Sequence, residues 1–116
     1  MAVTTIIPTQ MATGTGVVLT AGAGTAINTS NTMSIAYPIA GKLFLTIDSN
    51  HADTSASFAA GDFASAGLGA FAWEVGDTVI QGMFIDNNRL VDSDGNVVIT
   101  WATNSAGFIT AHYVVD

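Results

Sequence analysis

The chain lacks cysteine and has few charged residues. The absence of cysteine among its 116 residues excludes disulfides, thiolate catalysis and thiolate zinc sites. Two basic residues face nine acidic ones, which gives a net charge of −7 at pH 7. We therefore expect no binding of nucleic acid or of an anionic membrane surface, because both require clustered lysine and arginine. The length fits one domain over residues 1–116.

Long apolar runs and export signals are also missing. No stretch of about 18 apolar residues occurs, so no transmembrane helix is predicted. The N-terminus lacks the basic start and continuous apolar core of a secretory signal, which predicts synthesis in a cytoplasm without export by this route.

The few charged residues are unevenly distributed. Residues 1–41 carry no charged side chain, and every charged residue lies in 42–116. A neutral segment loses little solvation energy when it is buried in an interface. We therefore expect residues 1–41 to be covered by a partner or by neighbouring copies.

Helix-forming surface residues such as Glu, Lys, Arg and Gln are scarce, whereas strand patterns are frequent. In residues 42–47, Leu43, Leu45 and Ile47 alternate with other residues and would share one face. Asp94-Gly95 between apolar runs predicts a hairpin, and Gly82 predicts a bulge or a close contact inside a strand. Strands are predicted over residues 16–20, 25–37, 42–47, 54–58, 71–75, 78–85, 97–101 and 108–115.

Seven or eight short strands at this spacing predict an all-β fold, a compact antiparallel β-sandwich that is Ig-like or jelly-roll-like. Residues 42–116 would form the main strand framework, and residues 1–41 an uncharged N-terminal arm followed by the first strands. The first ten to fifteen residues show no alternation, so we expect the arm there.

Metal-site patterns are incomplete. His51 and Asp53 could supply two zinc ligands, but no third follows, which favours a surface loop. The segment from Asp92 begins like a calcium loop, but its twelfth position would be Thr103 instead of glutamate, which favours a hairpin. A looser calcium site using Asp86, Asp92 and Asp94 stays open. We predict neither metal nor cofactor.

Catalytic patterns are absent too. No serine lies in a nucleophile-elbow motif, the glycine-rich stretches lack a phosphate-binding lysine, and Glu74 is the lone glutamate. We therefore predict no catalytic residues and no enzyme activity. Trp73, Trp101 and Tyr113 could form a sugar-stacking platform, but their positions on the apolar sides of strands favour core packing. His112 would lie on the opposite, polar face of its strand.

From residue 42 onward the order of these features resembles the auxiliary capsid proteins, also called decoration or cement proteins, of tailed bacteriophages. The resemblance rests on turn and strand blocks at residues 43–47, 52–58, 60–62, 66–69, 75–78, 89–90 and 94–100, and on a closing strand to Val115. It covers about two thirds of the chain. It implies a compact β-sandwich, no catalytic residues, a virion location, the major capsid protein as partner and self-association as a homotrimer.

The resulting hypothesis is a structural protein that binds the outside of a phage head and stabilises it by non-covalent contacts. Two alternatives are a phage tail or fibre module and a carbohydrate-binding or adhesive β-sandwich. As capsid or subunit contacts we select apolar residues of the neutral N-terminal segment, namely Val3, Ile6, Ile7, Val17 and Leu19.

Overall fold

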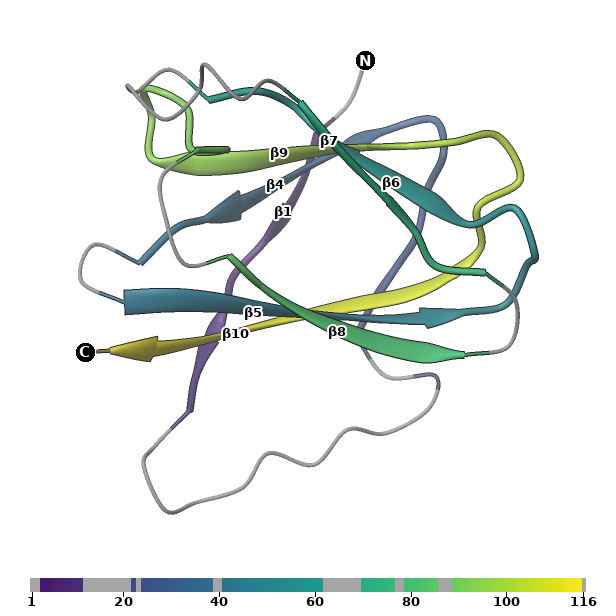
Figure 1. Cartoon of the computed structure of the whole chain (residues 1–116), viewed down its shortest axis with the longest axis horizontal. Helices are drawn as coiled ribbons and strands as arrows, with labels where there is room; N and C mark the ends of the chain where they lie inside the picture. Colours follow the sequence, from purple (N-terminus) through teal and green to yellow (C-terminus); the bar gives the residue numbers. More distant parts are fainter. Residues whose placement is uncertain are drawn as a thin grey trace.

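The computed structural model describes residues 3–11, 22, 24–38, 41–61, 70–76, 79–85 and 89–115. These residues form ten strands and no helix, arranged as two facing sheets (Figure 1). The strands are β1 (Val3–Ile6), β2 (Thr9–Gln10), β3 (Thr25–Ala26), β4 (Thr32–Ala36), β5 (Gly41–Ser49), β6 (Ser55–Phe58), β7 (Phe71–Glu74), β8 (Ile80–Ile85), β9 (Asn96–Trp101) and β10 (Gly107–Val115). The predicted all-β sandwich is confirmed.

The strand order shows how the chain moves between the two sheets. The first sheet has the order β1-β4-β9-β6-β7, and the second has the order β2-β10-β5-β8, with β3 also pairing with β10. All pairs are antiparallel except β1 with β4 and β2 with β10. Every step along the chain crosses between the sheets except those from β2 to β3 and from β6 to β7. Neighbouring strands in a sheet are therefore mostly distant in sequence.

The core lies between the sheets and follows the predicted alternation. Leu43, Leu45 and Ile47 of β5 are fully buried, as are Val97 and Ile99 of β9. The remaining fully buried large apolar side chains come from both sheets and are Met33, Ile35, Phe58 and Ile109. The alternating residues predicted in 42–47 thus point in turn to the core and to the outer face of the second sheet.

The N-terminal residues lie along the sheet edges instead of forming a separate arm. Residues 3–6 pair in parallel with β4, and residues 9–10 pair in parallel with β10. The chain thus leaves one sheet and joins the other around Pro8, which has no N–H to donate to a ladder. Each strand is too short to show an alternating pattern, which explains why the sequence did not predict them.

Other strand predictions differ in detail. The predicted strand over 25–37 is two strands, β3 and β4, separated by a turn in which the Asn31 N–H donates to the Asn28 carbonyl at 3.2 Å. The predicted strand over 16–20 lies outside the described residues. Strands β5 to β10 lie within one or two residues of the predicted ranges.

The predicted Asp94-Gly95 hairpin is confirmed. The Asp92 N–H donates to the Asn96 carbonyl at 2.8 Å, and Val91 bridges to Val97. The Asp92 Oδ1 accepts the N–H groups of Asp94 and Asn96, both at 2.9 Å. Gly95 has φ +82°, a conformation that residues with a Cβ adopt at a cost.

Substitutions at two glycines with positive φ compare the effect of backbone strain alone with that of strain plus a steric clash. A Cβ on Gly107 (φ +131°) would lie 2.0 Å from the Asp48 carbonyl oxygen, whereas a Cβ on Gly95 would have no atom within 4 Å. We expect Gly107→Ala to lower the free energy of unfolding by about 3 kcal/mol or more, and Gly95→Ala by about 1–2 kcal/mol. Urea denaturation measures both, and equal losses would contradict this account.

Candidate interaction surface

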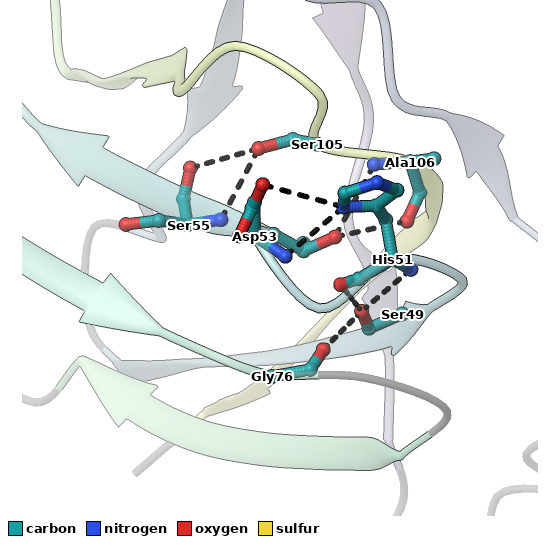
Figure 2. A network of polar contacts seen from close by, with 8 residues as sticks. Ser49, His51, Asp53, Ser55, Gly76, Ser105 and Ala106 are labelled. Atoms are coloured by element: carbon teal, nitrogen blue, oxygen red, sulfur yellow. Dashed lines mark hydrogen bonds and ion pairs between the residues drawn. The ribbon is translucent and has the colours of Figure 1, made fainter.

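A network of serine and threonine hydroxyls fastens the loops at one end of the sandwich (Figure 2). The Ser55 N–H donates to the Ser105 Oγ at 3.1 Å, and that hydroxyl lies 3.3 Å from the Ser55 carbonyl. The Ala106 N–H donates to the Thr54 Oγ1 at 3.2 Å, and that hydroxyl lies 3.3 Å from the Ala106 carbonyl. Each hydroxyl therefore hydrogen-bonds to main-chain groups of the other connection, which links the β5–β6 loop to the β9–β10 loop.

The neighbouring Ser49 extends this network to the loop before β8. Its hydroxyl contacts the Gly76 carbonyl and lies 3.0 Å from the His51 carbonyl. Ser49 and Thr54 are 1% exposed and Ser105 is 6% exposed. Buried hydroxyls with this many main-chain partners stabilise loops, so the network has a structural role.

His51 lies in the same loop and is exposed, as the surface-loop interpretation predicted. Its Nδ1 accepts the Asp53 N–H at 3.0 Å and lies 3.9 Å from the Asp53 Oδ2 (Figure 2). An open depression beside this loop is lined by Asp53 and Glu74, among others. Among the described residues, no three His, Cys, Asp or Glu side chains come together as a metal site. Asp86, one of the three residues of the looser calcium hypothesis, lies outside them.

The two tryptophans are core residues, as their strand positions favoured. Trp73 is 8% exposed and its Nε1 donates to the Gln81 Oε1 at 2.9 Å. Trp101 is 4% exposed and its Nε1 contacts the Met33 Sδ at 3.1 Å. Tyr113 is half-buried. Neither indole face is available for stacking on a sugar.

The N-terminal contact residues selected from the sequence divide into two groups. Val3 is 59% exposed on β1, and Ile7 is 84% exposed where the chain passes from β1 to β2. Ile6 is 5% exposed and belongs to the core, so its side chain is not available to a partner. Val17 and Leu19 lie outside the described residues. The structure thus presents two of the selected side chains to solvent, on one uncharged segment.

A second apolar surface lies on the outer face of the second sheet and was missed by the sequence analysis. Ile80 is 49% exposed and Phe84 is 55% exposed, both on β8. Phe84 pairs across the strands with Phe44 of β5, with ring centroids 4.9 Å apart. The available signal was that residues 80–85 are apolar at both even and odd positions, and so cannot bury all of them in one core.

Two polar side-chain atoms near the centre of this outer face are buried without a hydrogen-bond partner among the described residues. Thr46 is buried, and its Oγ1 has no hydrogen-bond partner; nor does the buried Nδ1 of the half-buried His112. Thr46 of β5 pairs with Thr110, and His112 of β10 pairs with Phe44. Both polar side chains therefore lie on the two strands that follow β8, the strand of the exposed Phe84, in the sheet order. The predicted placement of His112 on the face opposite the core is confirmed.

No protein-family model, no curated protein and no solved structure matches this chain. Among the described residues, no helix has the length and the apolar character needed to cross a membrane.

The hydroxyl network predicts a large effect for a small substitution. Thr54→Val keeps the shape of a side chain that is 1% exposed but leaves two main-chain groups of Ala106 without their partner. We expect a loss of about 1–3 kcal/mol in the free energy of unfolding. The matched control is Thr100→Val at an exposed position of β9, with an expected change within about 0.5 kcal/mol. Chemical denaturation in urea compares the two, and equal stabilities would argue against the network.

Proposed function

We propose that this protein is a decoration protein of a tailed bacteriophage. It would bind the outer surface of the phage head, with the major capsid protein as partner, and stabilise the head without covalent bonds. It would be made in the host cytoplasm and reside on the virion. The observation that supports this most is the neutral N-terminal segment, in which Ile7 is 84% exposed and Val3 is 59% exposed.

The physical basis of the proposal is the low cost of covering this segment. An exposed isoleucine gains about 1.5–3 kcal/mol when it is fully buried, and the absence of charged side chains from residues 1–41 means that no ion is desolvated in return. A protein that binds only the assembled lattice then stabilises that lattice by mass action. No catalytic step is needed for this role.

The alternatives receive less support from the same residues. A sugar-binding module would need accessible aromatic faces, but Trp73 and Trp101 are buried. A receptor-binding tail module would be favoured by exposed aromatic residues near loops 50–54 or 86–96. Phe84, which is 55% exposed and lies two residues before the second loop, meets that condition, whereas neither loop itself contains Phe, Trp or Tyr. Exposed aliphatic residues on a neutral edge fit protein–protein contact better.

The test uses heads of the encoding phage that were assembled without this protein. We expect the full chain to co-sediment with the heads and to raise their melting temperature in calorimetry. Ile7→Asp should weaken binding about tenfold or more, because it removes an apolar contact and adds a charge to be desolvated. Ala102→Asp, which adds the same charge in an exposed turn, is the matched control and should bind normally.

Two results would contradict the proposal. One is the absence of binding to heads by the wild-type chain. The other is unchanged binding by Ile7→Asp, which would exclude this N-terminal contact. Binding of the isolated protein to host cells, without binding to heads, would support the tail alternative instead.

A further inference from the structure

Within the described residues, one main-chain edge of strand β8 has no paired strand. β8 is the last strand of the second sheet, and only β5 pairs with it in the described part of the chain. The Ser49 N–H donates to the Val79 carbonyl at 2.9 Å, so the main-chain groups of odd residues here face β5. Because these groups alternate along a strand, the N–H and C=O of Ile80, Gly82 and Phe84 face away from β5. These three residues form the free edge.

The side chains of the free edge lie on the outer face of the sheet. Ile80 is 49% exposed, Phe84 is 55% exposed and Gly82 lies exposed between them. A Cβ on Gly82 would lie 2.5 Å from the Phe44 Cζ, so the glycine makes room for the Phe44 ring. The close contact predicted at Gly82 is thus confirmed, and the Phe44 ring packs against the Phe84 ring.

Free strand edges in stable monomers are normally protected by charge, proline, bulges or short length. β7, the last strand of the first sheet, has four residues and ends with Glu74. β8 has six residues, with the sequence IQGMFI, and contains neither a charge nor a proline. It is the longest strand at a sheet edge among the described residues, and it has none of these protections.

We propose that β8 pairs with β8 of a second copy of this chain, antiparallel and about a two-fold axis, so that the two second sheets become one continuous sheet. The register places Gly82 opposite Gly82 of the second copy and Ile80 opposite its Phe84. Three residue pairs then exchange main-chain hydrogen bonds, two bonds in each pair. Opposite residues in this register share the outer face, as antiparallel pairing requires.

The occupant is identified as a second copy by the symmetry of the edge. Ile80 and Phe84 lie at equal distances from Gly82, so an inverted copy places an apolar side chain opposite each of them. A two-fold interface must use the same patch on both copies, and this patch is complementary to itself. With a net charge of −7 on each copy, association of two copies also requires an interface without carboxylates, and β8 supplies one.

The flanking charges favour the antiparallel orientation. Asp48 pairs with Ile80 at one end of the β5–β8 ladder, and Lys42 lies beyond the Leu43–Ile85 pair at the other end. Inversion of the second copy brings its Lys42 to the end at which Asp48 of the first copy lies. The separation is about three strand spacings, or about 14 Å. Salt weakens attraction over that distance, so these charges orient the copies and contribute little to affinity.

The test is the mass of the full chain in solution, without any capsid present. We expect sedimentation equilibrium to show a concentration-dependent dimer. In the double variant Ile80→Lys with Phe84→Lys, each lysine faces a lysine of the other copy. We expect the dimer dissociation constant to rise at least about tenfold, because like charges directly opposite each other oppose pairing.

The matched control is Ile80→Lys with Phe84→Glu, which introduces the same number of charges. In the proposed register each lysine then faces a glutamate of the second copy, so dimerisation should be retained. Both variants change exposed side chains, and circular dichroism with urea unfolding verifies that each is folded.

Four outcomes would overturn the inference. A wild-type chain that stays monomeric at millimolar concentration excludes the contact. A dimer that persists in the Lys/Lys variant, or that is lost equally in the Lys/Glu variant, excludes this edge or this register. A trimer, the state implied by the resemblance to decoration proteins, would also exclude it, because a two-fold pairing of one edge closes at two copies. None of these measurements involves capsid binding, so the proposed function stands or fails separately.

Discussion

The core shared by the two sheets, to which the inner faces of β5 and β9 contribute fully buried side chains, is the constraint on which the rest of the structure depends. Both strands lie inside their sheets, and their core side chains are fully or almost fully buried. Burial of such side chains contributes about 1.5–3 kcal/mol each. Because the two strands are about fifty residues apart in sequence, this core forms only when the chain has crossed repeatedly between the sheets. The short loops and positive-φ glycines serve these crossings.

A sandwich built in this way leaves strands with one unpaired side at the edges of its sheets, and the protection of these edges differs between the two sides of the molecule. At one side, the N-terminal segment runs along both sheets, as β1 on the first and β2 on the second, which covers β4 and part of β10. At the other side, β7 is short and carries Glu74, while β8 is longer and uncharged. The scarcity of charge also explains the hydroxyl network. Loops that other proteins fasten with ion pairs are here fastened by Ser49, Thr54 and Ser105.

The sequence predicted the elements whose signal is local. Alternation in β5, β9 and β10 and the Asp94-Gly95 turn identified strands and core almost residue by residue. It did not predict β1 and β2, and it did not separate β3 from β4, because strands of two to four residues carry no period and their pairing partners are distant. Nor did it predict which apolar residues are exposed. Ile6 and Ile7 are neighbours of the same type, yet one is 5% and the other 84% exposed. Neighbouring residues of an extended segment point to opposite faces, and the pairing of β1 with β4 decides which of the two faces the core, a tertiary feature.

The two proposed contacts occupy opposite edges of the second sheet and can therefore coexist. Ile7 lies beside β2, at the start of the strand order, and β8 lies at its end. In a two-fold dimer through β8, the two N-terminal segments would lie at the far ends of the continuous sheet. Such a dimer would present two capsid contacts, and binding of the first would raise the effective concentration of the second. Weak contacts of a few apolar side chains could then hold the protein on a lattice, where many equivalent sites repeat, without holding it on a single capsid subunit.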